Sequence, residues 1–245
     1  MLHRLSDGAP RSARDLVDGL GLLRPPEPGR RPRVVGSMIA SIDGRAAVQG
    51  RSVGLGHPAD RALLRELRTG VDAILVGTTT IGAERYANLL DPEQRAHRVV
   101  RGMDEHPLVA TVSRDLRLPL GAPIFAEPET RLLAFTESAA PAPRVAARLE
   151  VHRFAPGRLT LQAALNELAA RGTRGVLCEG GPTLLRRLVA EDCLDDLLLT
   201  VSPLLAAGDA PAILEGPGLG EPARLALREV HRADDHLFLH YGARR

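Results

Sequence analysis

The chain has 245 residues, of which 44% are hydrophobic and 25% are charged, a composition typical of a folded globular protein rather than a disordered one. Its formal net charge is only +2 and aromatic residues make up 2%, which argues against a nucleic-acid reader built on basic patches and stacking platforms. All 32 basic residues are arginine, so neither a lysine Schiff base nor a lysine-containing phosphate loop is available.

The cysteines, histidines and apolar runs exclude several further classes. Cys178 and Cys193 are too few for a disulfide framework or a four-cysteine zinc site, and the histidines form no metal-binding motif, so we expect no metal. The first residues lack the apolar core of a signal peptide, and no apolar run approaches the roughly 20 residues of a membrane span. We therefore expect a cytoplasmic protein without a membrane partner.

The predicted elements follow a regular order after the first 32 residues, which we interpret as an N-terminal extension of a single domain over residues 33–245. Within the extension, residues 13–23 are expected to form a short helix that the proline-rich segment 24–29 ends. Apolar runs predict strands at 34–40, 72–77, 108–112, 131–136, 150–154, 175–179 and 196–201. Helices are expected at 58–69, 137–150, 160–170 and 182–189.

Short apolar strands that alternate with helices are typical of a parallel sheet. Residues 225–230 and 236–241 form two apolar segments with no helix between them, unlike most of the earlier strands. They predict a hairpin at the edge of the sheet. The predicted fold class is therefore α/β, a mostly parallel central sheet with an antiparallel C-terminal hairpin.

Two glycine-rich turns after predicted strands are candidate anion sites. In the stronger one, Glu179 is followed by Gly180, Gly181 and Pro182 at the start of a helix, whose free N–H groups and dipole favour a phosphate. Glu179 would lie at the carboxyl end of a strand, where open α/β sheets bind ligands. The second turn, residues 77–82, has hydroxyls that could hold a nucleotide. Both turns are equally compatible with ordinary helix initiation, and neither matches the G-x-G-x-x-G fingerprint.

Two more polar segments follow strands. Asp43 and Gly44 favour a turn, with a polar side chain aimed into a cleft as the functional alternative. Ser113 and Arg114 could take a ribose phosphate, because the planar guanidinium matches phosphate oxygens, although a surface arginine is the commoner outcome.

Taken in order, three motifs resemble the reductase domain of riboflavin biosynthesis, and more narrowly the stand-alone pyrimidine reductases of actinobacterial type. They are Ala40-Ser41-Ile42-Asp43-Gly44, Asp72-Ala73-Ile74-Leu75-Val76-Gly77 followed by Thr80, and Glu179-Gly180-Gly181-Pro182-Thr183-Leu184. The resemblance covers roughly residues 33–242. It implies a dihydrofolate-reductase-like three-layer sandwich and an NADPH-dependent oxidoreductase, commonly a homodimer. Its small-molecule substrate would be a phosphorylated aminopyrimidine, 5-amino-6-(5-phosphoribosylamino)uracil or a close relative, reduced at C1′ of the ribosylamine.

The resemblance also implies residue roles by position. The implied cofactor contacts are Ala40, Gly77, Thr80, Glu84, Ser113, Arg114, Gly180, Gly181, Pro182, Thr183 and Leu184. Substrate contacts would fall on Ser52, Arg61 and Glu179. Glu179 and Asp43 are the candidate general acids, and water is an equal alternative.

This sequence departs from the family pattern at two places, the predicted strand 34–40 and the segment after Thr80. It also lacks the zinc deaminase motif of the bifunctional enzymes. A common strand lysine is replaced by Ser37, and residues 84–91 lack the substrate-binding arginine that usually ends this segment. These departures keep two alternatives open. One is an NADPH-dependent dihydropterin or dihydrofolate reductase, and the other is a non-catalytic nucleotide-binding protein.

Overall fold

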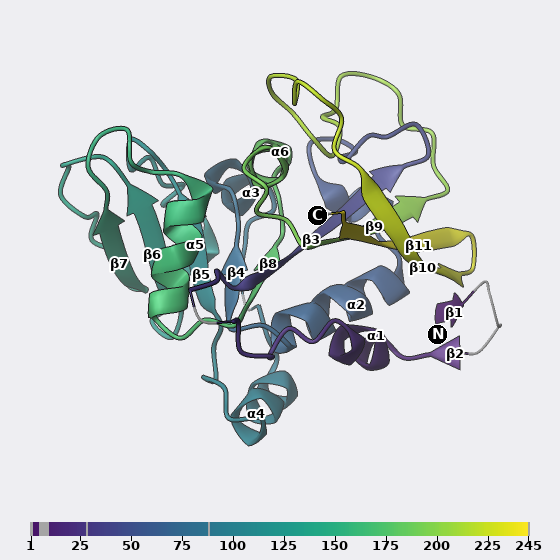
Figure 1. Cartoon of the computed structure of the whole chain (residues 1–245), viewed down its shortest axis with the longest axis horizontal. Coiled ribbons are helices and arrows are strands. Elements are labelled where there is room, and N and C mark those ends of the chain that lie inside the picture. The colour runs from purple at the N-terminus through teal and green to yellow at the C-terminus, as the bar shows by residue number, and fades with distance from the viewer. Residues whose placement is uncertain (1, 5–9, 28, 88, 245) are drawn as a thin grey trace.

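A computed structural model of the protein describes residues 2–4, 10–27, 29–87 and 89–244, and these residues form one eleven-stranded sheet with helices on both faces (Figure 1). The strands are β1 (Leu2–Arg4), β2 (Pro10–Arg11), β3 (Arg33–Ser41), β4 (Ala73–Leu75), β5 (Leu108–Val112), β6 (Arg131–Thr136), β7 (Arg148–Arg153), β8 (Gly175–Cys178), β9 (Asp196–Ser202), β10 (Leu225–Ala233) and β11 (His236–Ala243). The α-helices are α1 (Ala13–Gly19), α2 (Pro58–Thr69), α3 (Thr78–Ala83), α4 (Pro92–Val100), α5 (Leu161–Ala170) and α6 (Pro182–Ala190), with 3-10 turns η1 (Ser52–Leu55) and η2 (Pro123–Ala126).

The strand order is β2-β1-β10-β11-β9-β3-β8-β4-β5-β6-β7. All pairs from β9 to β7 in this order are parallel, whereas β11 is antiparallel to both β9 and β10. The predicted α/β class with an antiparallel C-terminal hairpin is therefore confirmed. The hairpin is not at the edge of the sheet, however, because β1 of the N-terminal extension pairs with β10, and β2 pairs with β1.

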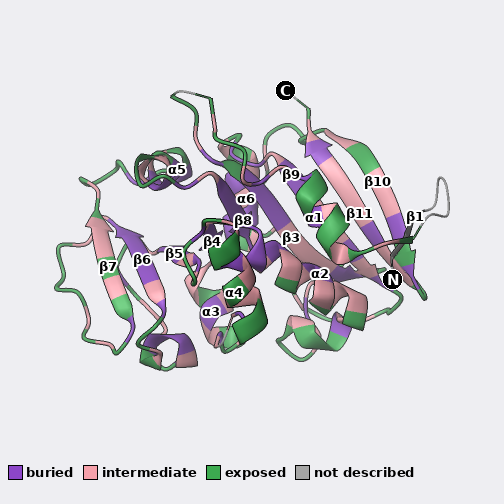
Figure 2. Cartoon of the chain, turned by 90° about the horizontal axis from the view of Figure 1, so that it is seen from below, coloured by how far each residue is buried: buried purple, intermediate pink, exposed green. Residues whose placement is uncertain are grey.

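Side-chain alternation along the central strands divides the core between the two faces of the sheet. Val34 of β3 packs in a cluster with α5 and α6, whereas its neighbour Val35 packs with α1 and α2 on the other face. A further cluster joins Ile81 of α3 to Val109 and Leu132. Figure 2 shows the central strand β3 as largely buried, which is the pattern expected of a parallel strand covered on both faces.

Most predicted elements match the structure, and the strands at 108–112 and 131–136 match to the residue. The helix expected at 137–150 is wrong, because this segment is a loop that leads into β7. Pro141 and Pro143 remove backbone donors that a helix would need. The Arg153 side chain instead holds the loop through the carbonyl oxygens of Ser138 and Ala140, at 3.2 and 2.7 Å.

Helix α4 was not predicted, although its start carries a recognisable signal. Asp91 and Gln94 form a reciprocal capping box around Pro92, which occupies the first turn. None of the helices in the described part of the chain has both the length and the apolar character needed to cross a membrane.

The Arg98 side chain of α4 is fully buried and fixes the end of α2. Its Nη1 donates to the carbonyl oxygens of Arg68, Thr69 and Val71 at 3.1, 3.1 and 2.6 Å, and its Nε donates to that of Asp104 at 2.8 Å. Burial lowers the pKa of Arg98 to about 10. One guanidinium group therefore satisfies the carbonyl groups at the C-terminal end of α2.

Replacing this side chain is expected to destabilise the protein strongly. Arg98→Met should lower the free energy of unfolding by about 3 kcal/mol, because buried carbonyl groups lose a charged donor. Arg101→Met is the matched control, since Arg101 forms only a half-exposed ion pair with Asp18 at 3.2 Å. Urea unfolding should show that Arg101→Met lowers the free energy of unfolding by about 1 kcal/mol or less. An equal loss in both variants would contradict the role given to Arg98.

Candidate active site

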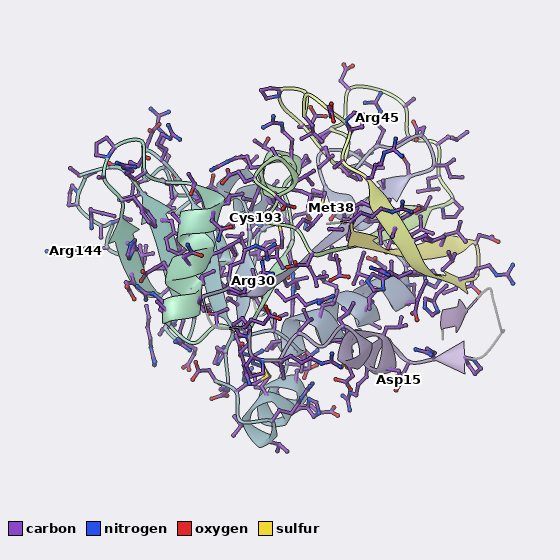
Figure 3. The ribbon with its side chains drawn as sticks, in the orientation of Figure 1. Asp15, Arg30, Met38, Arg45, Arg144 and Cys193 are labelled. Atoms are coloured by element: carbon purple, nitrogen blue, oxygen red, sulfur yellow. The ribbon has the colours of Figure 1, made fainter. Side chains whose placement is uncertain are left out.

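A cleft of about 260 Å³ opens at the carboxyl ends of β3 and β8, between α2, α3 and α6. Its floor is the β3 segment Ser37, Met38 and Ile39, and Figure 3 labels Met38 in the middle of the molecule. The carboxyl edge of a parallel sheet is where α/β proteins bind ligands, because helix starts and loops converge there. This cleft is therefore the candidate active site.

Glu179, the residue that follows β8, is held in the cleft by two side chains. Arg68 of α2 donates from Nε and Nη2 to the two Glu179 oxygens, each at 2.7 Å. The Tyr86 hydroxyl donates to Glu179 Oε2, and the Arg68 guanidinium carbon lies 5.4 Å from the centre of the Tyr86 ring. With donors on both oxygens, the Glu179 carboxylate is held as a hydrogen-bond acceptor.

The charge on Glu179 changes the titration of both partners. Burial acts against the charge on Arg68, but the Glu179 carboxylate outweighs this effect and raises the pKa of Arg68 above its usual range. Burial, and then the same carboxylate, raise the pKa of Tyr86 well above that of a free tyrosine. Both side chains therefore remain hydrogen-bond donors across the ordinary pH range.

The two glycine-rich turns lie side by side, because β4 and β8 are neighbours in the sheet. The Gly77 N–H donates to the Gly180 carbonyl oxygen at 2.8 Å, and the Gly180–Gly181 peptide bond is cis. A Cβ on Gly181 would lie 2.6 Å from Thr80 Oγ1, so the close approach of the turns requires glycine. Gly77 and Gly181 are the N-cap residues of α3 and α6, and neither cap makes a side-chain hydrogen bond. The positive ends of two helices therefore adjoin one space, which suits an anion.

Glu84 closes the rim of the cleft beside these turns. Its Oε1 accepts a hydrogen bond from the Ser52 N–H at 2.7 Å, and its Oε2 lies 3.7 Å from Arg51 Nε. Glu84 thus ties the start of η1 to the end of α3. Of the residues predicted from the sequence, six line the cleft: Ser52, Thr80, Glu84, Glu179, Gly181 and Pro182.

Asp43 does not line the cleft. Its carboxylate accepts hydrogen bonds from Ser41 Oγ at 2.5 Å and from the N–H groups of Ala206 and Ala207 at 3.0 and 2.8 Å. These bonds, that from Ser41 above all, lower the pKa of Asp43 to about 2. The Asp43 side chain holds the loop at Ala206 and Ala207 by hydrogen bonds. Its position outside the cleft and its low pKa argue against the expected role as a proton donor.

The remaining predicted contacts lie around the cleft rather than on its walls. Arg61 is exposed on α2, and Thr183 is exposed at the start of α6. Ala40 is buried at the end of β3, and Leu184 is buried in the core beneath α6.

Ser113 and Arg114 follow β5, the second strand from β8 in the sheet order. Ser113 Oγ donates to the Arg117 carbonyl oxygen at 3.2 Å, and Arg114 Nε lies 3.6 Å from a Glu137 oxygen. Both residues lie at the same carboxyl edge as the cleft, beyond α3.

The structure adds residues that sequence reasoning missed: Asp60, Leu64 and Tyr86 line the cleft, and Arg68 contacts Glu179. Asp60, Leu64 and Arg68 recur every four residues on α2, so one face of the helix presents all three, and this spacing was the available signal. The Asp60 carboxyl lines the cleft and accepts a hydrogen bond from Thr200 Oγ1 at 2.6 Å. Tyr86 lies in the irregular segment after α3, and no sequence pattern marked it.

The buried ion pair between Arg68 and Glu179 is expected to contribute to the stability of the fold. Arg68→Met is expected to lower the free energy of unfolding by about 3–5 kcal/mol, because it leaves a buried carboxylate without its cation. Arg68→Met/Glu179→Gln also removes that charge and should be less destabilised than Arg68→Met alone. Urea unfolding of the wild type, both single variants and the double variant measures the coupling. Single-variant losses that simply add would contradict the pair.

The comparison with known proteins agrees with this geometry. The model of the RibD C-terminal domain family matches residues 32–239. A 2,5-diamino-6-ribosylamino-4(3H)-pyrimidinone 5′-phosphate reductase of Methanothermobacter thermautotrophicus is 28% identical over 218 residues, which cover 86% of this chain and 98% of that protein. The riboflavin biosynthesis protein RibD of Mycobacterium tuberculosis is 31% identical over 189 residues, which cover 74% of this chain and 45% of RibD. The chain thus spans about half the length of that relative.

A solved structure shares the fold over nearly the whole chain. The pyrimidine reductase-like protein of Corynebacterium diphtheriae superposes with a TM-score of 0.78 and 24% identity, and the match covers 96% of this chain and 100% of that one. The family match begins just before β3 and ends within β11, so it includes the strands and turns that form the cleft. The resemblance inferred from three short motifs is confirmed, and the chain belongs to the RibD C-terminal domain family.

Proposed function

We propose that this protein is an NADPH-dependent reductase of riboflavin biosynthesis that converts the ribosylamino group of a phosphorylated aminopyrimidine to a ribitylamino group. The observation that carries the proposal is one cleft that joins two uncapped helix starts to the polar group of Glu179, Arg68 and Tyr86. The first part suits a dinucleotide and the second a polar ring or sugar. The reductase names of the archaeal relatives support the same reaction.

The residues at the glycine turns fit the cofactor. Gly181 lies too close to Thr80 Oγ1 to carry a Cβ, and no side chain caps the start of α3 or α6, so the backbone at these starts can lie close to a diphosphate. Gly77, Gly180, Gly181, Pro182 and Thr183 would hold that diphosphate, with Thr80, Glu84 and Ala40 toward the nicotinamide and Ser113 and Arg114 toward the ribose, while Leu184 anchors the start of α6 in the core. When bound, the reduced nicotinamide supplies a hydride to C1′ of the substrate.

Glu179, Ser52 and Arg61 are the proposed substrate contacts on the other side of the cleft. Glu179, oriented by Arg68 and Tyr86, accepts hydrogen bonds from N–H or O–H groups of the ring or sugar. Ser52 at the rim and the exposed Arg61 are the proposed phosphate contacts. We further propose a cytoplasmic homodimer in which residues 33–245 act as one reductase domain.

Turnover assays distinguish this function from its alternatives. The purified protein is expected to oxidise NADPH with 5-amino-6-(5-phosphoribosylamino)uracil or with the 2,5-diamino pyrimidinone phosphate, followed by the loss of nicotinamide absorbance and by product mass. Turnover of dihydrofolate in place of both pyrimidines would favour the dihydropterin-type alternative. NADPH binding by calorimetry with no turnover of any of these substrates would identify a non-catalytic nucleotide-binding protein.

Arg114 should contribute to the choice between NADPH and NADH. Its side chain is 65% exposed at the carboxyl edge of the sheet, where its guanidinium can pair with a ribose phosphate. Arg114→Ala is expected to reduce the preference for NADPH, measured as a ratio of kcat/KM values, by about tenfold. Arg148→Ala, an exposed arginine at the opposite edge of the sheet, is the control. An unchanged preference in Arg114→Ala would remove this residue from the cofactor site.

A further inference from the structure

Three carboxyl groups line the cleft, and their surroundings differ in charge. Glu84, at the rim, is held by the Ser52 N–H and lies beside Arg51. Glu179 is paired with the guanidinium of Arg68. Asp60 forms no ion pair within the described residues, and its only hydrogen bond there comes from Thr200 Oγ1, at 2.6 Å. Glu179 therefore has a cation as a direct partner, whereas Asp60 has no ion-pair partner among the described residues.

The strand register places these two groups on opposite sides of the cleft floor. On one side of β3, Ile39 pairs with Thr200 of β9, the partner of Asp60. On the other side, Gly36 pairs with Cys178, the residue before Glu179. Two strand spacings, roughly 10 Å, separate β9 from β8, and the offset of three residues along β3 adds roughly 10 Å in the strand direction. Because Asp60 and Glu179 line the same cleft, a substrate that lies diagonally across Ser37, Met38 and Ile39 can contact both.

We propose that Asp60 is the general acid of the reduction and that Thr200 is its positioning residue. The inference rests on the proposed function and adds the proton donor that this function needs. As C1′ of the ring-opened imine gains a hydride, the π pair of the C1′=N bond moves to nitrogen and forms a bond to the Asp60 proton. The imine becomes an amine, Asp60 is left as a carboxylate, and water returns its proton. The substrate is reduced by the two electrons of the hydride, and the cofactor is oxidised.

The electrostatic surroundings of Asp60 suit this step. Burial raises the pKa of Asp60, although the Thr200 hydroxyl and the charges of His236, Arg61 and His57 partly offset the rise. These groups come from β9, β11, α2 and the residue that caps α2. A carboxyl group whose pKa lies closer to the working pH retains a neutral fraction that can donate. Asp43, with a pKa of about 2, does not.

The first test compares two carboxyl-to-amide changes on the same helix. Asp60→Asn keeps the shape and an acceptor for Thr200, but it has no acidic proton. The rate of hydride transfer in a single turnover with NADPH and the pyrimidine phosphate should fall about 100-fold, and the Kd for NADPH should change by less than about threefold. Glu66→Gln is the control, because Glu66 pairs with Arg14 of α1 outside the cleft. Its rate should stay within about twofold of the wild type.

The pH dependence supplies a second readout. The acid must be protonated to donate, so the wild-type rate should fall as pH rises through the pKa of Asp60, and Asp60→Asn should lack this fall. Thr200→Val removes a hydrogen bond that lowers the pKa of Asp60. In this variant the fall should move to higher pH, a shift that loss of packing alone would not produce.

A third readout needs neither cofactor nor turnover. Carboxyl-carbon NMR of the protein alone should show one aspartate resonance, absent from Asp60→Asn, that titrates above the ordinary aspartate range. Titration of Asp60 at or below that range would overturn the proposal. So would an Asp60→Asn enzyme whose saturated rate stays within about threefold of the wild type, even with a raised KM.

Turnover by the wild-type protein distinguishes a failure of this proposal from a failure of the proposed function. A wild type that reduces the pyrimidine, with a rate unaffected by Asp60→Asn, overturns the role of Asp60 and leaves the proposed function standing. A wild type that reduces neither pyrimidine overturns the proposed function and the role of Asp60 in it together, whatever the NMR titration shows.

Discussion

The parallel pairing of β8 with β3 on one side and β4 on the other is the constraint that places every part of the cleft. Pairing with β4 brings the turn after Leu75 against the turn after Cys178, so that Gly77 bonds to Gly180. Pairing with β3 puts Glu179 beside the floor of the cleft. All three strands are buried on both faces, so the hydrophobic core holds this register. A slip of one residue would send Glu179 to the opposite face.

Helix α2 supplies the second wall, and its burial explains the contrast between the carboxyl groups. The apolar residues Leu63 and Leu67 pack α2 onto the sheet, while Asp60 lines the cleft and Arg68 contacts Glu179. Arg98 holds the end of the helix from which Arg68 reaches Glu179. Because the helix crosses from β9 toward β8, it places Arg68 in an ion pair with Glu179, whereas Asp60 forms no ion pair within the part of the chain that the structure describes. Two carboxyl groups in one cleft can therefore take different roles.

The N-terminal extension is integrated with the sheet. Strand β1 adds to β10, and α1 packs against α2 on the same face as the cleft wall. Ser12 and Asp15 form a capping box that starts α1, so the extension has its own local signal for helix formation. Its residue Val17 contributes to the core around Leu67. The extension thus stabilises the helix that carries Asp60 and Arg68.

Local patterns in the sequence determined the strands from β3 onward, most helices, the two glycine turns and the family, because each depends on residues within a few positions of one another. They did not mark β1 and β2. The tertiary structure alone decided which side chains meet. Arg68 and Tyr86 reach Glu179 across 111 and 93 positions of sequence, distances at which no periodicity carries information. Asp43 and Glu179 were both candidate general acids in the sequence, but the carboxylate of Asp43 accepts hydrogen bonds from Ala206 and Ala207 outside the cleft. The order of the strands in the sheet determines which of these distant side chains are in contact. It depends on packing of the whole core, so no single segment of the sequence predicts it.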